Sequence, residues 1–182
     1  MYLDMKIEIM DTTLRDGEQM QGVSYTPVEK LHIARFLLAD LRVDRIEVAS
    51  ARVSSGEFEG LKQITGWARG NNLHEKVEVL GFVDGDLSLN WIKEAGGKVI
   101  NLLCKGSLRH LEKQLRKTPG QHATDIKEIV RKAESADMQV NIYFEDWSNG
   151  MISSEDYVFY MIDSLKNEKI KRFMLPDTLG IL

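Results

Sequence analysis

The sequence predicts an α/β fold: a (β/α)8 TIM barrel that is incomplete in this chain, with about six strands and five βα units. Short runs rich in β-formers alternate from end to end with longer segments whose apolar residues recur three and four positions apart. Polar residues also gather where at least four predicted strands end, which is how barrel enzymes build a site. With 182 residues and no linker rich in Pro, Gly or Ser, one domain is expected, without an internal boundary.

Six segments are predicted to be strands, and all six are expected to run parallel because helical segments join them. These are residues 6–11, 45–49, 76–83, 98–103, 139–144 and 172–175. Chemistry-bearing residues follow several of them. Arg15 and Asp16 come after the first strand, and Glu47 and Ser50 lie at the end of the second. Tyr143 and Glu145 lie at the end of the fifth, and Asp177 and Thr178 follow the sixth.

The connections carry helix signals in order along the chain. Thr26 is a candidate N-cap, followed by Pro27 at the first helical position and Glu29 at the third. Apolar stripes predict further helices over 58–68 and 87–95, the second closed by Gly96 and Gly97, and a short helix over 108–115. Another helix is expected to begin at residues 118–119, and the last near 153–155.

An open doubly wound sheet is the alternative architecture for six parallel strands. When such a sheet binds a nucleotide, it usually carries a glycine-rich turn after the first strand. Here the turn is Arg15-Asp16-Gly17-Glu18-Gln19, with one glycine and three ionisable groups. The sequence therefore favours the barrel.

Composition excludes several classes of function. With 24 Lys and Arg against 28 Asp and Glu, the net charge of −4 gives no basic surface for nucleic acid or anionic lipid. No apolar stretch is long enough for a membrane span, and the first ten residues lack the apolar run of a signal peptide. The one cysteine, Cys104, is expected to be a buried, inert thiol. Small-molecule substrates and a cytoplasmic location are predicted.

The segment Asp11-Thr12-Thr13-Leu14-Arg15-Asp16-Gly17-Glu18-Gln19 resembles the signature of a family of metal-dependent, Claisen-condensing barrels. That family contains the isopropylmalate, homocitrate and citramalate synthases and the hydroxymethylglutaryl-CoA lyases. Further matches at residues 46–50, 101–103, 143–146 and 175–180 extend the resemblance over nearly the whole chain. Within the family, residues 49–54, 80–85 and 145–150 are most similar to bacterial citramalate synthases.

The resemblance implies an acyltransferase that condenses acetyl-CoA with a 2-oxo acid in branched-chain amino-acid biosynthesis and then hydrolyses the thioester. Pyruvate, giving citramalate, is favoured because Leu80, Leu103 and Tyr143 would wall a pocket with room for a methyl group. A 2-isopropylmalate synthase acting on 2-oxoisovalerate, or a homocitrate synthase, is the alternative. Less favoured are a hydroxymethylglutaryl-CoA lyase-type enzyme and a non-catalytic α/β module.

The resemblance also implies roles for individual residues. Arg15 would hydrogen-bond the oxo oxygen, Asp16 would bind a divalent metal (Mn2+, Mg2+ or Zn2+), Tyr143 would hold the oxo acid, Glu145 would take part in acid–base chemistry at acetyl-CoA, and Thr178 would bind the substrate carboxylate. Glu47, flanked by apolar residues, is expected to be an inward charge that supports the site. Simpler alternatives are a turn-capping Asp16, an Arg15–Glu47 ion pair and an ordinary strand Tyr143. Asp11 is expected only to order its turn.

The family completes its metal site with two histidines one residue apart after the seventh strand, and this sequence has no such His-x-His pair. A complete barrel also needs about 250 residues. Residues 1–182 are therefore expected to be the N-terminal portion of one TIM-barrel catalytic domain, without the last barrel units or any regulatory domain. Alone it is expected to be inactive, and a homodimer is expected at full length.

Overall fold

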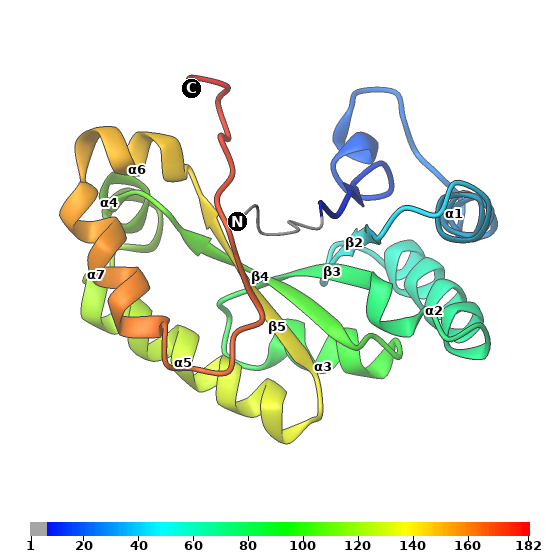
Figure 1. Cartoon of the computed structure of the whole chain (residues 1–182). Helices are drawn as coiled ribbons and strands as arrows, with labels where there is room; N and C mark the ends of the chain where they lie inside the picture. Colours follow the sequence, from blue (N-terminus) through cyan, green and yellow to red (C-terminus); the bar gives the residue numbers. More distant parts are fainter. Residues whose placement is uncertain (1–6) are drawn as a thin grey trace, which may run out of the picture.

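The computed structural model describes residues 7–182, which form a curved, six-stranded parallel sheet with helices along its convex side (Figure 1). The strands are β1 Met10–Asp11, β2 Arg45–Ser50, β3 Val77–Phe82, β4 Val99–Lys105, β5 Gln139–Glu145 and β6 Arg172–Met174. Their order in the sheet is β1-β2-β3-β4-β5-β6. A doubly wound sheet would instead place later strands on both sides of the first. The predicted incomplete barrel is confirmed, and the doubly wound alternative is wrong.

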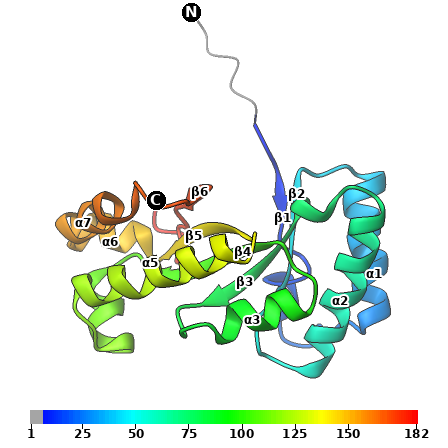
Figure 2. The same ribbon diagram turned by 90° about the horizontal axis from the view of Figure 1, so that it is seen from below.

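The helices cover one face of the sheet, as the view in Figure 2 makes clear. They are α1 Pro27–Arg35 with the π-helical turn η2 Phe36–Asp40, α2 Ser55–Gly70, α3 Leu87–Glu94, α4 Leu108–His110 with η4 Leu111–Leu115, α5 Pro119–Ser135, α6 Trp147–Ser153 and α7 Glu155–Leu165. Short 3-10 turns occur at η1 Gly17–Gln19 and η3 His74–Lys76. Thr26 caps α1 through a capping box with Glu29, as its sequence predicts, and Thr118, at a predicted helix start, forms a second capping box with Gln121.

Two local predictions are wrong. The strand expected over 6–11 is shortened to β1 Met10–Asp11 within the described residues, and residue 6 lies outside them. The predicted helices also do not include α6, whose sequence WSNGMIS contains several poor helix formers. Tertiary packing explains it: a Cβ atom added at Gly150 would lie 2.0 Å from the carbonyl oxygen of Gly106, so only glycine allows α6 to pack against the end of β4.

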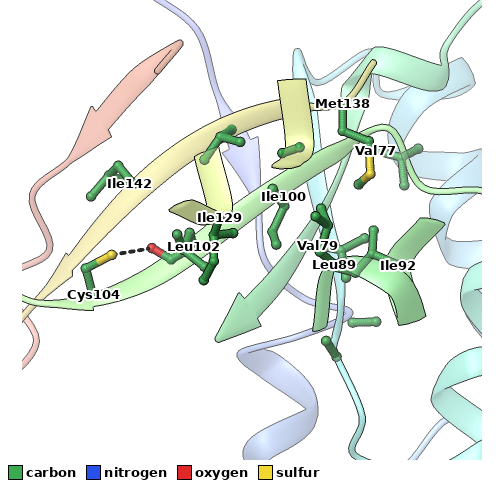
Figure 3. Packing of buried hydrophobic residues seen from close by; sticks show 14 of the residues in the cluster. Val77, Val79, Leu89, Ile92, Ile100, Leu102, Cys104, Ile129, Met138 and Ile142 are labelled. Atoms are coloured by element: carbon green, nitrogen blue, oxygen red, sulfur yellow. Dashed lines mark hydrogen bonds between the residues drawn. The ribbon is translucent and has the colours of Figure 1, made fainter. Parts of the chain in front are cut away.

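The apolar core lies between the sheet and the helices (Figure 3). Alternate residues of β3 and β4, such as Val79 and Leu102, point into this core, so the intervening residues face the concave side. Cys104 is fully buried there, as predicted, and burial raises the pKa of its thiol. Within residues 7–182, no helix is long and apolar enough to cross a membrane.

Candidate active site

A pocket of about 550 Å³ opens on the concave side, at the carboxyl ends of the strands. It is lined by Arg15, Asp16, Gln19, Ser50, Val53, Leu80, Phe82, Leu103, Tyr143, Glu145, Pro176, Asp177 and Thr178. Seven of the eight predicted site residues are in this lining, and the eighth, Glu47, binds Arg15 directly. The structure therefore brings together side chains that lie as far apart in sequence as Arg15 and Thr178.

The turn after β1 positions the first two of these residues. The carbonyl oxygen of Thr12 accepts hydrogen bonds from the backbone N–H groups of Arg15, Asp16 and Gly17, at 3.0, 2.8 and 3.2 Å. The Asp11 carboxylate accepts from the backbone N–H and the hydroxyl of Thr13, at 2.9 and 3.2 Å. Asp11 thus orders this turn by local hydrogen bonds, as predicted.

The Arg15 guanidinium is held between two carboxylates. Its Nε donates to Glu47 Oε2 at 2.5 Å, and Nη1 donates to Asp16 Oδ1 at 2.8 Å. Burial acts against the charge, but these carboxylates, Glu47 foremost, raise the pKa of Arg15 above its ordinary value. The guanidinium carbon also lies 6.0 Å from the centroid of the Tyr143 ring. The expected Arg15–Glu47 ion pair is present, and it fixes a permanent cation at the pocket floor.

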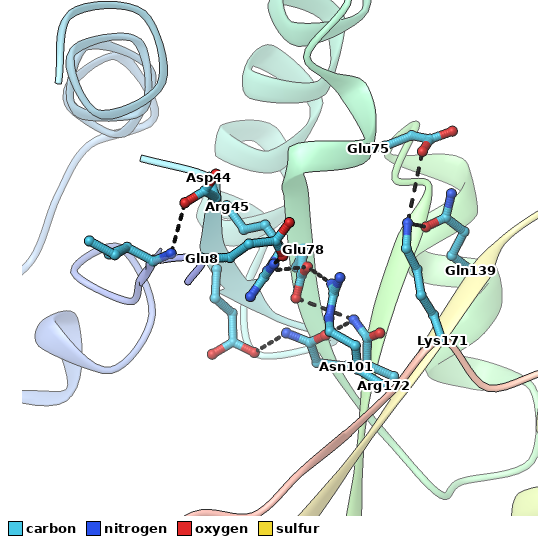
Figure 4. A network of polar contacts seen from close by, with 12 residues as sticks. Glu8, Asp44, Arg45, Glu75, Glu78, Asn101, Gln139, Lys171 and Arg172 are labelled. Carbon is cyan, nitrogen blue, oxygen red and sulfur yellow. Dashed lines mark hydrogen bonds and ion pairs between the residues drawn. The ribbon is translucent and has the colours of Figure 1, made fainter. Parts of the chain in front are cut away.

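A chain of buried polar side chains runs from Glu47 across the barrel interior. Asn101 Nδ2 donates to Glu47 Oε1 at 2.8 Å, and Asn141 Nδ2 donates to Asn101 Oδ1 at 2.8 Å and to Glu78 Oε2 at 3.3 Å. Glu78 also pairs with Arg172, and with Arg45 Nε at 3.3 Å (Figure 4). This chain connects the pocket floor to the amino-terminal end of the sheet.

Sequence reasoning missed Glu78, although a signal was present. Glu78 lies between two valines on β3, just as Glu47 lies between apolar residues on β2, and the two residues are register partners. Burial raises the pKa of Glu78, while the charges of Arg172 and Arg45 oppose that rise. A carboxylate at the same position of two neighbouring strands predicts a shared polar layer inside a barrel.

Strand β5 supplies two residues to the pocket wall from one face. Tyr143 and Glu145 are two positions apart, so both point to the concave side. Burial, followed by the charge of Glu47, raises the pKa of Tyr143, so its hydroxyl is protonated at neutral pH. Leu103 is the register partner of Tyr143 and also of Phe82, so the three form a continuous wall across neighbouring strands.

The segment after β6 closes one side of the pocket. The Thr178 hydroxyl oxygen accepts a hydrogen bond from the Asp146 backbone N–H at 2.9 Å, which leaves the hydroxyl proton available to donate. The Asp177 carboxylate accepts from the Ser148 hydroxyl at 2.6 Å and from the backbone N–H groups of Ile181 and Leu182. These bonds fix the segment against β5 and α6.

The described residues do not form a metal site by themselves. The Asp16 side chain is 61% exposed and lines the pocket, but one of its oxygens is paired with Arg15. Within residues 7–182 no group of three His, Cys, Asp or Glu side chains is placed to hold a metal ion. Asp16 offers one hard oxygen ligand, which is fewer than Mg2+, Mn2+ or Zn2+ needs. Its role as a metal ligand therefore stays a prediction.

Comparison with known proteins agrees with this geometry. The family profile described as HMGL-like matches residues 6–182. The chain belongs to the HMGL-like family. A 2-isopropylmalate synthase from Polaromonas naphthalenivorans is 36% identical over 177 residues, covering 96% of this chain and 33% of that protein. A putative (R)-citramalate synthase from Methanopyrus kandleri is 32% identical over 177 residues, covering 97% of this chain and 33% of that protein.

Solved structures of hydroxymethylglutaryl-CoA lyases have a similar architecture. The hydroxymethylglutaryl-CoA lyase from Pseudomonas aeruginosa superposes with a TM-score of 0.74 at 16% identity, covering 97% of this chain and 59% of that chain. The lyase from Bacillus subtilis gives a TM-score of 0.68 at 19% identity, covering 97% of this chain and 60% of that chain. At this identity the likeness establishes the fold. The chain spans about a third of the length of its curated relatives.

Proposed function

We propose that this chain is the N-terminal portion of a TIM-barrel catalytic domain that condenses acetyl-CoA with a 2-oxo acid. The observation that carries the proposal is the pocket in which Arg15, Tyr143, Glu145 and Thr178 converge from three separate segments: the turn after β1, strand β5 and the segment after β6. A 2-oxo acid presents a carboxylate, which carries a negative charge, and an adjacent carbonyl oxygen, which develops negative charge during the condensation. A buried cation, a neutral phenol and a free hydroxyl proton match that charge pattern.

In this proposal the residues divide the work by position. Arg15 donates to the oxo oxygen as it becomes an alkoxide, and Glu47 keeps the guanidinium in place. Thr178 donates to the substrate carboxylate while its oxygen stays bound to the Asp146 N–H. Glu145, which lines the pocket at the end of β5, accepts the proton of the acetyl group.

We infer that pyruvate is the preferred 2-oxo acid. Leu80, Leu103 and Tyr143 all line the pocket, and bulky side chains on three neighbouring strands leave space for a methyl group rather than an isopropyl group. One excess methylene in such a pocket costs about 1–3 kcal/mol in discrimination. Condensation with pyruvate would give citramalate, an intermediate of isoleucine biosynthesis.

A 2-isopropylmalate synthase, acting on 2-oxoisovalerate in leucine biosynthesis, is the second candidate. The observation that favours it is the name of the Polaromonas relative, which is 36% identical to this chain. The two candidates share the Arg15, Glu145 and Thr178 chemistry and differ only in the volume left by the pocket wall.

The experiment is a substrate comparison with the full-length protein, meaning this chain together with the remaining barrel units. Acetyl-CoA is supplied with pyruvate, 2-oxoisovalerate or 2-oxoglutarate, and free thiol is recorded. The proposal expects thiol release with the highest kcat/KM for pyruvate. A higher value for 2-oxoisovalerate would select the second candidate. Cleavage of hydroxymethylglutaryl-CoA without condensation would indicate a lyase, and no turnover of any kind would indicate a non-catalytic module.

A divalent metal is proposed for the full-length protein, with Asp16 as one ligand and the other ligands outside these 182 residues. When bound, such an ion polarises the carbonyl of the oxo acid. We expect Asp16→Ala to weaken metal affinity in calorimetric titration with Mn2+, whereas Arg15→Lys leaves that affinity nearly intact and lowers turnover about a hundredfold. Equal loss of metal in both variants would contradict the assignment.

We also propose that the full-length protein is a cytoplasmic homodimer. Light scattering tests the homodimer by measuring the molar mass in solution.

A further inference from the structure

Glu145 does not stand alone at the pocket edge, because it is ion-paired with Lys105. The two residues are register partners at the last positions of β5 and β4, and the Lys105 ammonium donates to Glu145 Oε2. The Lys105 side chain is 12% exposed and that of Glu145 is 28% exposed. Glu145 lines the pocket and Lys105 does not, so Lys105 can affect a bound substrate through its contact with the Glu145 carboxylate.

The backbone of Lys105 is held by two helices. Its N–H donates to Nε2 of His122 on α5 at 3.1 Å, and its carbonyl oxygen accepts from the hydroxyl of Tyr157 on α7 at 2.7 Å. His122 is fully buried and Tyr157 is 5% exposed. Burial, with the charge of Lys117, lowers the pKa of His122 to about 4, so the ring is a neutral acceptor at neutral pH.

The backbone of Glu145 is tied to the same point. The N–H of Gly106, the residue after Lys105, donates to the Glu145 carbonyl oxygen at 2.7 Å. A Cβ atom added at Gly106 would lie 2.7 Å from that oxygen, so the close approach requires glycine. Both the backbone and one carboxylate oxygen of Glu145 are therefore fixed by residues 105–106.

We propose that Lys105 is a positioning residue for Glu145: held from behind by His122 and Tyr157, it binds one carboxylate oxygen so that the other faces the pocket. This inference rests on the proposed function of Glu145 in the condensation. Side-chain positioning of this kind acts on the rate of the reaction, because a misplaced proton acceptor still allows the 2-oxo acid to bind to Arg15 and Thr178.

A purely structural role for the same ion pair has different consequences. If Lys105 only neutralised a partly buried carboxylate, its removal would lower the free energy of unfolding without affecting turnover by the folded protein. The chain offers a matched control at the other end of β4. Lys98 directly precedes this strand and forms an ion pair with Asp137, away from the pocket.

The test compares Lys105→Met, Lys105→Arg and the control Lys98→Met in the full-length protein. We expect Lys105→Met to lower kcat at least tenfold while KM for the 2-oxo acid stays within about threefold of wild type. Lys105→Arg, which keeps a cation beside Glu145, should restore kcat to within about threefold, and Lys98→Met should leave it unchanged. An unchanged kcat in Lys105→Met, or an equal loss in Lys98→Met, would overturn the proposal.

A second measurement on the 182-residue chain needs no activity. A water-soluble carbodiimide joins an amine and a carboxylate in direct contact as an amide, and peptide mass spectrometry locates the link. We expect a Lys105–Glu145 link in the native chain, with at least fivefold lower yield in the urea-unfolded chain. Absence of the native link overturns the positioning role. If the full-length wild type shows no turnover, the proposed function fails, and the cross-link alone then decides whether Lys105 holds Glu145.

Discussion

Removing the carboxylate of Glu47 should lower the free energy of unfolding, because the Arg15 guanidinium would lose its buried ion-pair partner. Glu47 is fully buried, and its two oxygens accept from two donors, Arg15 Nε and Asn101 Nδ2. In Glu47→Gln one of these oxygens becomes an NH2 group that faces a donor. Breaking a buried pair by removing one partner costs about 3–5 kcal/mol. Because Arg15 keeps Asp16 as a second partner, we expect the lower end, about 3 kcal/mol of the free energy of unfolding.

The assay is a double-mutant cycle read by urea unfolding at neutral pH. Arg15→Met leaves the buried Glu47 carboxylate without its cation and is also expected to cost about 3 kcal/mol or more. The double variant has neither charge, so its loss should be smaller than the sum of the single losses by about 2 kcal/mol. Glu59→Gln is the matched control: Glu59 is an exposed residue of α2 whose carboxylate accepts a hydrogen bond from Gln63 on the same helix. Its expected change is within about 0.5 kcal/mol.

Two outcomes would refute this reasoning. Losses in the two single variants that add within about 0.5 kcal/mol would mean that Arg15 and Glu47 are not coupled in the folded chain. A Glu47→Gln variant as stable as the Glu59→Gln control would mean that the interior carboxylate is solvated, contrary to its burial. Neither result depends on catalytic activity.

Three further outcomes are expected. Leu80→Ala in the full-length protein should raise the ratio of kcat/KM for 2-oxoisovalerate to kcat/KM for pyruvate about tenfold, because it enlarges the pocket. Leu89→Ala, in the core on the convex side, should leave that ratio unchanged, and equal ratios in the two variants would contradict the role of Leu80 in the pocket wall. Gly150→Ala should lower the free energy of unfolding, measured in urea, by about 1–3 kcal/mol or more, because its Cβ would lie 2.0 Å from a backbone oxygen. Gly66→Ala, at a position in α2 with open space around it, should raise that free energy by about 0.5–1 kcal/mol, and the reverse order would contradict the close packing of α6. His122 has a pKa of about 4 in the folded chain against an ordinary value near 6.5, so its stabilising contribution is present above pH 6.5 and is lost as the pH falls toward 4. Wild type should therefore lose about 3 kcal/mol more than His122→Asn between pH 7 and 4, and parallel pH profiles would disprove it.

Sequence patterns were sufficient to predict the parallel α/β architecture and most residues of the pocket. Strand and helix periodicity locate all six strands, and Thr26 and Thr118 mark helix starts that the structure confirms. In parallel strands joined by helices, the carboxyl ends all open on one side, so residues that follow the strands must meet there. The sequence therefore places Arg15, Tyr143 and Glu145 in one pocket, and the structure confirms that they share it.

Most of the contacts between these side chains follow from strand register and packing, which local sequence patterns do not specify. The pairing of Lys105 with Glu145 depends on the register between β4 and β5, and the link from Glu47 to Glu78 passes through two asparagines on separate strands. The alternation of residues along a strand predicts the face on which a side chain lies, but it does not specify how two strands are aligned. A shift of one residue between β4 and β5 would change every cross-strand partner, because the side chains on the shifted strand would then point to the opposite face. Helix α6 is a further case, because its sequence opposes a helix and the close contact at Gly150 stabilises it. Cross-strand partners and such backbone contacts arise from the packed fold, which is why local sequence cannot specify them.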